Sequence, residues 1–273
     1  MAVREETPVP ILCDDLDEAI ERYKAEGYRL DMIFPADKPR EALMSVPPAI
    51  AGGLSSELAQ EQATKPPLRL VVPTGSVQPP PIAGGTDPKS SDPGWIRGRA
   101  GMEYRDLIPD RLGGKVIASH IRLTEGGEVP DYVHYHKIDF QMIYCKKGSI
   151  RVVYEDQGEP FWLEAGDLVV QPPEIRHRVL ECTAGAEVIE ITSPAEHETW
   201  VEHEIQLPNR VTNPEREFSG QRFFRYVATD QKAESRSAME SILMDVAILL
   251  RLVPNEIGML RIVTAFSQSL FRM

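Results

Sequence analysis

The sequence has little cysteine and no recognisable export pattern. Its three cysteines, Cys13, Cys145 and Cys182, lie far apart and include no Cys-x-x-Cys pair. Small buried side chains are the expected role of such scattered cysteines. The N-terminus, Met-Ala-Val-Arg-Glu-Glu-Thr, lacks the basic and then apolar pattern of a signal peptide. These two absences predict a reduced, cytoplasmic location.

Clusters of basic residues and long uncharged apolar runs are also missing. Lys and Arg total 30 against 42 Asp and Glu, which gives a formal net charge of −12. Phosphate binding needs grouped Lys and Arg, so we expect no nucleic-acid partner. The apolar run at residues 237–253 contains Glu240, Asp245 and Arg251. Because these charges interrupt it, we expect a packed or dimer-forming helix and no membrane span.

The 273 residues are long enough for one large domain or two small ones. A stretch dense in Pro, Gly, Ser and Thr at residues 73–94 indicates a linker. We therefore predict a small α+β segment at 1–75, a Pro/Gly-rich linker at 76–100 and a β-rich domain at 101–208. A C-terminal extension with a helix follows at 209–273.

The first segment reads as a strand, a helix and a second strand. Residues 9–12 are apolar, and Asp14 or Asp15 can cap a helix over residues 16–26. Residues 28–34 alternate as a strand does, and 68–72 are a later strand candidate. The pattern weakly resembles the opening strand–helix unit of a glyoxalase-type, vicinal-oxygen-chelate module. Its first strand lacks the histidine that such enzymes use, so we carry over no metal chemistry.

Three histidines and a glutamine in the β-rich domain have the spacing of a metal site. His134 and His136 are two residues apart, and alternate residues of a strand share a face. Gln141 follows after a turn, and His177 comes about forty residues later, beyond a further strand and the Pro172–Pro173 turn. If these side chains converge, three imidazoles and an amide oxygen can bind a metal and leave room for substrate.

At these residues the chain resembles the cupin superfamily, whose barrels carry two spaced motifs. The first motif is matched by Gly127, His134, His136, Gln141 and Gly148, and the second by Gly166, Pro172 and His177. There are departures: one extra residue precedes His134, Gln141 replaces the usual glutamate ligand, Glu174 replaces a glycine and Glu181 replaces an asparagine. The resemblance covers roughly residues 101–208.

The resemblance implies a mainly β fold, a cupin-type double-stranded β-helix (jelly-roll) barrel of the RmlC-like kind. It also implies a divalent metal held by His134, His136, Gln141 and His177, with Fe(II) as first choice and Mn, Zn or Ni as other ions that imidazole suits. The implied function is a metal-dependent enzyme acting on a small organic substrate, a non-haem dioxygenase by first choice. Cupins commonly pair through barrel edges, so a homodimer is expected.

Strand alternation predicts the lining of the site. Tyr132, Ile143, Cys145 and Val179 should project inward around the metal. Glu181 lies four residues beyond His177, so it points inward if no bulge intervenes, as a general base or as a ligand that compensates for Gln141; the plainer interpretation is a rim carboxylate in solvent. Outside the motifs, we expect His120 to be a structural histidine. His197 and His203 should be surface residues.

Several alternatives stay open. Gln141 can be a metal ligand or a donor behind the ligands. The barrel can serve a metal-dependent isomerase or lyase of a sugar-like acid, or a non-catalytic module that binds a small molecule. Turnover without oxygen distinguishes the isomerase from the dioxygenase, and ligand-dependent stabilisation without product identifies the binding module.

Overall fold

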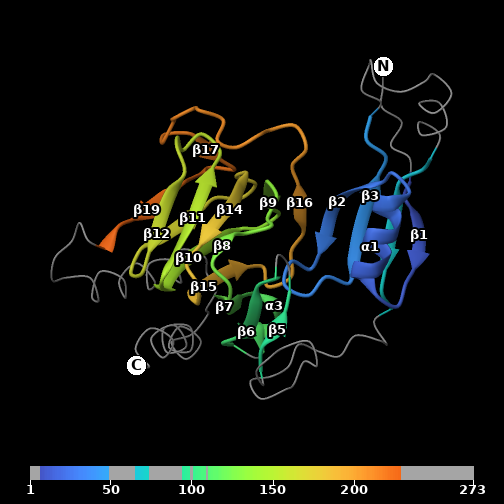
Figure 1. Ribbon diagram of the computed structural model, residues 1–273, viewed down its shortest axis with the longest axis horizontal. Coiled ribbons are helices and arrows are strands. Elements are labelled where there is room, and N and C mark those ends of the chain that lie inside the picture. The colour runs from blue at the N-terminus through green and yellow to red at the C-terminus, as the bar shows by residue number, and fades with distance from the viewer. Residues whose placement is uncertain (1–6, 49–64, 74–93, 99–100, 109, 229–273) are drawn as a thin grey trace. The chain divides into compact units, whose positions relative to one another are not determined.

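The computed structural model describes residues 7–48, 65–73, 94–98, 101–108 and 110–228 (Figure 1). The chain divides into two compact units, residues 1–79 with 198–201, and residues 80–197 with 202–273. Within the described ranges, no helix is both long and apolar enough to cross a membrane. The predicted linker falls largely, and the predicted C-terminal helix wholly, outside the described residues.

The first unit is a sheet covered by one helix. In the order β1-β4-β3-β2-β16, β1 runs parallel to β4, and β4–β3, β3–β2 and β2–β16 are antiparallel. The elements are β1 Val9–Leu12, α1 Leu16–Ala25, β2 Arg29–Phe34, β3 Glu41–Ser45, β4 Leu68–Val71 and β16 Thr199–Val201. The predicted strand, helix, strand and later strand are confirmed. Strand β3 lies between β2 and β4 in the sheet.

Helix α1 begins where its sequence predicts. Asp15 is the N-cap, and its carboxylate accepts a hydrogen bond from the Glu18 backbone amide at 3.1 Å. Leu16, Ala19 and Ile20 form the buried stripe and join a core with strand residues of the same unit. This core is separate from the core of the barrel. The resemblance to a glyoxalase-type module stays a prediction.

The second unit contains most of the strands. Its elements are β5 Ile96–Arg97, β6 Glu103–Asp106, the short helical turn α3 Arg111–Gly114, β7 Ile117–Leu123, β8 Gly127–Glu128, β9 His134–His136, β10 Phe140–Lys147, β11 Ser149–Tyr154, β12 Phe161–Glu164, β13 Leu168–Gln171, β14 His177–Cys182, β15 Ala186–Ser193, β17 Glu217–Phe218, β18 Gln221–Arg222 and β19 Phe224–Tyr226.

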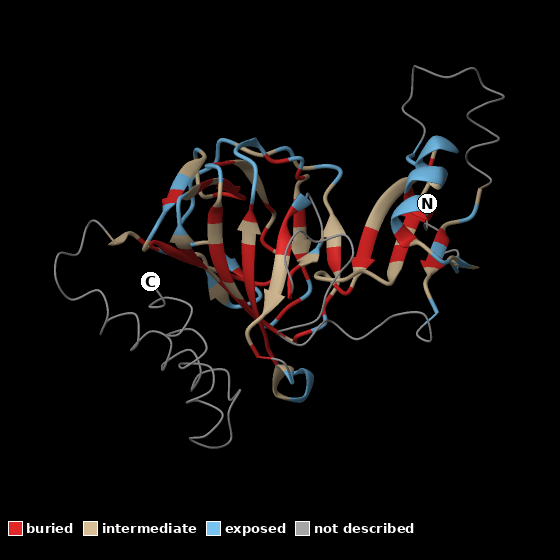
Figure 2. Ribbon diagram, turned by 60° about the horizontal axis from the view of Figure 1, so that its bottom comes forward, coloured by how far each residue is buried: buried red, intermediate tan, exposed pale blue. Residues whose placement is uncertain are grey.

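These strands form two antiparallel layers. One has the order β9-β14-β11-β12, with β8 also paired to β14, and the other has the order β19-β13-β10-β15-β7-β6-β5. Buried residues are concentrated on the strands, whereas many connecting turns are exposed (Figure 2). The predicted mainly β, jelly-roll barrel is therefore confirmed.

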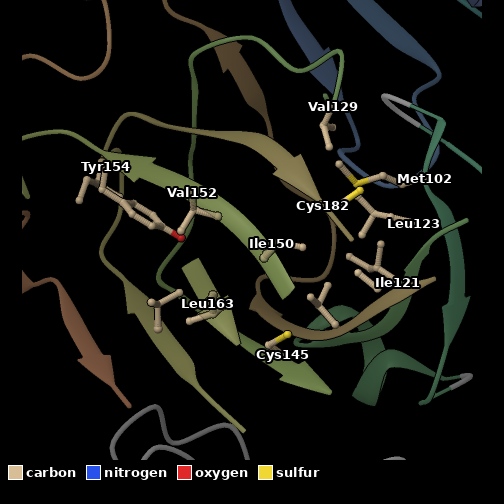
Figure 3. Packing of buried hydrophobic residues seen from close by; sticks show 14 of the residues in the cluster. Met102, Ile121, Leu123, Val129, Cys145, Ile150, Val152, Tyr154, Leu163 and Cys182 are labelled. Atoms are coloured by element: carbon tan, nitrogen blue, oxygen red, sulfur yellow. The ribbon is translucent and has the colours of Figure 1, made fainter. Parts of the chain in front are cut away.

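The interior of the barrel is apolar along much of its length. Side chains from both layers meet there, including Ile121, Cys145, Ile150, Val152 and Leu163 (Figure 3). The opposite face of the larger sheet has its own cluster, formed by alternate residues such as Met142, Leu168 and Ile189. In β10 and β15, odd and even positions thus belong to different cores, which determines which side chains reach the site.

Candidate metal centre

The three predicted histidines meet inside the barrel. His134 and His136 lie on β9, and His177 opens β14, where it pairs directly with His134. The ring centroids are 4.3 Å apart for His134–His177 and 5.1 Å apart for the other two pairs. One ligand atom from each ring lies within 4.8 Å of the others, and all three residues are buried. The cluster can hold a metal ion.

Backbone carbonyls fix the tautomers of two of these rings. Nδ1 of His134 lies 2.7 Å from the carbonyl oxygen of Tyr132, and Nδ1 of His177 lies 2.9 Å from that of Ile175. A carbonyl oxygen only accepts, so Nδ1 carries the hydrogen and Nε2 keeps its lone pair. This is how metal-binding histidines are usually oriented. The donor set therefore fits a divalent ion that imidazole binds.

Asp131, which the sequence analysis did not single out, connects the two histidine strands. Its carboxylate accepts hydrogen bonds from the amides of Tyr132 and Val179, each at 3.0 Å. One carboxylate oxygen also lies 3.6 Å from Nδ1 of His134. The side chain is buried. Asp131 thus anchors the segment before β9 to β14 and brings a negative charge close to the first histidine.

Gln141 has both ends of its amide engaged. Its oxygen accepts a hydrogen bond from Nε2 of Gln171 at 2.6 Å, and its nitrogen donates to the carboxylate of Glu190. Gln171 also reaches His177, with 3.3 Å between the two Nε2 atoms. Gln171 therefore connects Gln141 to His177. Its role as a metal ligand stays a prediction.

The predicted pocket residues lie on the interior face. Cys145 belongs to the interior core, and Ile143 and Val179 pack against it. The ring of Tyr132 meets that of His134 edge-on at 5.8 Å. Burial raises the pKa of the Cys145 thiol to about 12, so this thiol is an inert apolar filler at neutral pH. Ile143, Cys145 and Val179 are thus part of the apolar interior.

Glu181 does not face the histidines, and its predicted inward position is wrong. Strand β14 has one extra residue between the pairs Val152–Val179 and Arg151–Glu181. This bulge reverses the alternation, so Glu181 lies opposite Arg151 and forms an ion pair with it at 2.7 Å. The Glu181 side chain is 37% exposed, which identifies it as an outward-facing carboxylate.

The predicted surface position of His197 is wrong. It is buried, and its ring lies at 90° to that of His136 with 5.3 Å between centroids. Its Nδ1 lies 3.2 Å from the carbonyl oxygen of Pro194. His197 therefore packs beside the cluster instead of lying on the surface. His203 is exposed, as expected.

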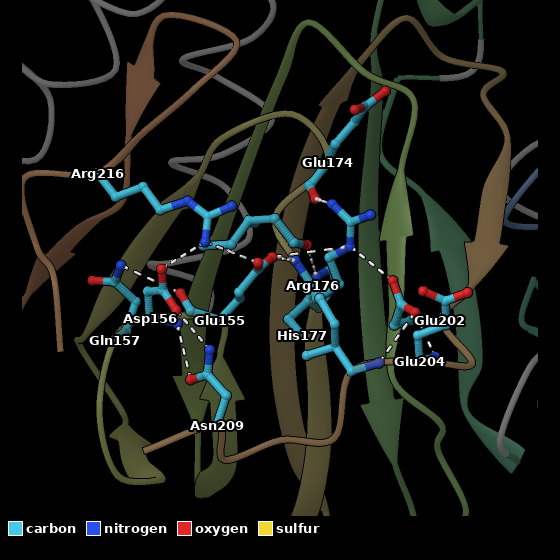
Figure 4. A network of polar contacts seen from close by, with 12 residues as sticks. Glu155, Asp156, Gln157, Glu174, Arg176, His177, Glu202, Glu204, Asn209 and Arg216 are labelled. Atoms are coloured by element: carbon cyan, nitrogen blue, oxygen red, sulfur yellow. Dashed lines mark hydrogen bonds and ion pairs between the residues drawn. The ribbon is translucent and has the colours of Figure 1, made fainter. Parts of the chain in front are cut away.

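Charged residues hold the chain where it enters β14. Arg176, next to His177, donates to Glu202 at 3.0 Å and to the carbonyl of Glu174 at 3.1 Å (Figure 4). Arg216 donates to the carboxylate of Glu155 at 2.9 Å, and the Glu155 amide donates to the carbonyl of Arg176 at 2.8 Å. These contacts fix the backbone from which His177 projects inward.

His120 is confirmed as a structural histidine. Arg105 lies 3.1 Å from its Nδ1, and Glu187 lies 2.8 Å from its Nε2. Arg105 can only donate, so the neutral ring donates from Nε2 to Glu187. Burial, with Lys146 nearby, lowers the pKa of His120 to about 4. Burial alone would raise the pKa of Glu187, but its bonds with Lys146 and His120 lower it to about 2.

These shifts predict that acid destabilises the barrel. Between pH 6.5 and about 4 the unfolded chain protonates His120 while the folded chain keeps it neutral, so the free energy of unfolding falls as pH falls. The folded-state pKa of Glu187 predicts a further loss below about pH 4.5. Urea unfolding from pH 7 to 4, with a chelator present, measures the effect. His120→Gln should flatten the slope, and His203→Gln should leave it unchanged; equal slopes in all three proteins would contradict the assignment.

Comparisons with known proteins find similarity over part of the chain. Residues 119–192 match the family model of the cupin domain. No curated protein matches the sequence significantly. Among solved structures, an RmlC-like cupin from Shewanella frigidimarina is 27% identical, with TM-score 0.31, covering 37% of this chain and 83% of that chain. KdgF from Halomonas sp. is 21% identical, with TM-score 0.31, covering 37% and 86%.

Oxalate decarboxylase from Bacillus subtilis is 22% identical, with TM-score 0.28. The match covers 34% of this chain and only 25% of the decarboxylase chain, so it spans a quarter of that protein's length.

Proposed function

We propose that the protein is a metal-dependent enzyme acting on a small organic substrate, of the non-haem dioxygenase type; residues 119–192 match the family model of the cupin domain. One observation carries the proposal. Three buried imidazoles converge in the barrel, and two of them have Nδ1 bonded to a backbone carbonyl, which leaves Nε2 as a lone-pair donor.

In this proposal His134, His136 and His177 hold the ion, with Fe(II) favoured and Mn, Zn or Ni also suited to imidazole. A bound Fe(II) would supply Lewis-acid and oxygen-activating chemistry. The chain itself supplies the ligand geometry and the shape of the cavity. Ile143, Cys145 and Val179 belong to or pack against the apolar interior, and the Tyr132 ring meets that of His134 edge-on at 5.8 Å.

Oxygen dependence tests the proposal. The Fe(II)-loaded protein is incubated with a panel of small two-oxygen chelators, namely β-dicarbonyl compounds, catechols and hydroxy acids. We expect product formation in air that stops under strict anaerobiosis, with both atoms of each O₂ consumed entering the product. Because the substrate takes up both oxygen atoms and supplies the electrons, the assay contains no separate reductant. Product and O₂ uptake are measured together, with the His177→Ala protein as the control.

Two other outcomes would replace the dioxygenase proposal. Turnover of sugar acids that continues without oxygen identifies a metal-dependent isomerase or lyase. Ligand-dependent thermal stabilisation with no product under either atmosphere identifies a binding module. The homodimer and the cytoplasmic location are further proposals, and light scattering of the purified protein tests the first.

A further inference from the structure

A carboxylate outside both motifs points into the barrel next to the histidine cluster. Glu190 lies on β15 opposite Ile143, and its neighbours Ile189 and Ile191 belong to the cluster on the other face of the sheet. Val188, two residues earlier, belongs to the interior core. Strand alternation therefore turns Glu190 inward, onto the same face as Gln141.

Glu190 is the end of a chain of hydrogen bonds that leads to His177. The Gln141 amide donates to Glu190 and accepts from Gln171 at 2.6 Å. The oxygen of Gln171 accepts from the hydroxyl of Tyr154 at 2.8 Å, and its nitrogen lies 3.3 Å from Nε2 of His177. Gln141, Gln171 and Tyr154 are all buried.

The carboxylate determines the direction of this chain. An ionised carboxylate only accepts, so Gln141 must turn its nitrogen to Glu190 and its oxygen to Gln171. Gln171 must then turn its nitrogen towards Gln141 and His177, and its oxygen to Tyr154. Without the charge on Glu190, either amide could be reversed. One residue on β15 thus fixes the orientation of two amides beside the histidines.

The charge matters as well as the orientation. Residue 141 is an amide at the position where the motif normally carries a carboxylate, so the motif residues contribute three neutral imidazoles and no negative charge. Building on the proposed metal centre, we infer that Glu190 is its positioning residue: from β15 it supplies the negative charge missing at residue 141 and fixes the orientation of the Gln141 amide. Glu190 acts on the metal centre through Gln141, whose amide it contacts directly.

An exchange of the two side chains tests this inference. In Glu190→Gln a hydrogen bond to residue 141 can still form but the charge is lost. The double variant Gln141→Glu/Glu190→Gln keeps one amide and one carboxylate in contact and moves the charge to the motif position. We measure Mn(II) affinity of the full-length proteins by calorimetry, and the melting temperature of each metal-free protein.

We expect Glu190→Gln to weaken Mn(II) binding roughly 10–100-fold, the usual effect of losing a group behind a metal ligand. The double variant should recover most of that affinity, while all metal-free proteins melt close to the wild type. Glu187→Gln, which removes a carboxylate from the other face of β15, is the matched control and should change affinity little.

Wild-type affinity in Glu190→Gln, or no recovery in the double variant, would overturn the inference and leave the metal centre standing. If the wild-type protein itself binds no Mn(II), Fe(II) or Zn(II), the proposed function fails and the inference fails with it. The two failures are therefore distinguishable.

Discussion

Replacing His177 with alanine is expected to abolish metal binding by the barrel. His177 is in contact with both other histidines, pairs with His134 across β9 and β14, and has its Nδ1 fixed by a carbonyl. Removing it leaves two imidazoles, both from β9. Losing a residue that only supports a metal ligand weakens metal binding by up to roughly 100-fold. Losing His177, which is itself a proposed ligand, should weaken metal binding by more than that. His134→Ala should behave in the same way.

Metal content of protein purified with and without added Fe(II) measures this effect. The wild type should hold about one divalent ion per chain, as one three-histidine site requires, and His177→Ala should hold almost none. His203→Ala, at an exposed histidine, is the matched control and should keep the ion. Circular dichroism of the variant must show the native strand content. Full occupancy in a folded His177→Ala protein would contradict the assignment.

The second large effect is expected in the barrel interior. Leu163 on β12 is fully buried, lies opposite Ile150 and belongs to the interior core (Figure 3). Leu163→Ala should reduce the free energy of unfolding by about 2–5 kcal/mol, since both apolar burial and packing are lost. Urea denaturation of the metal-free protein measures it. Glu164→Ala, at the exposed neighbouring position, should stay within about 0.5 kcal/mol. Equal stabilities of the two variants would show that the interior is not packed as described.

The parts that local spacing controls were predictable from sequence. His134 and His136 share a face because alternate strand residues do, and the resemblance to the two cupin motifs led us to expect His177 beside them. The same alternation brought Ile143, Cys145 and Val179 inward. The helix after Asp15 followed from its cap and apolar stripe. Each of these inferences needs only residues close in sequence or two motifs of known spacing.

The parts that depend on strand register were not predictable. Glu181 points outward because β14 contains a bulge, which no local pattern announces. Glu190 and Gln171 reach Gln141 because β15 and β13 flank β10 in a particular register. His197 lies beside His136 although the intervening sequence gives no sign of it.

The most direct test of the account is an anomalous scattering experiment on a crystal of the Zn(II)-loaded protein. The account predicts one strong peak inside the barrel, at about 2.1 Å from a nitrogen of each of residues 134, 136 and 177. A crystal with no peak there, or with a ring of this trio turned away from the ion, would contradict it.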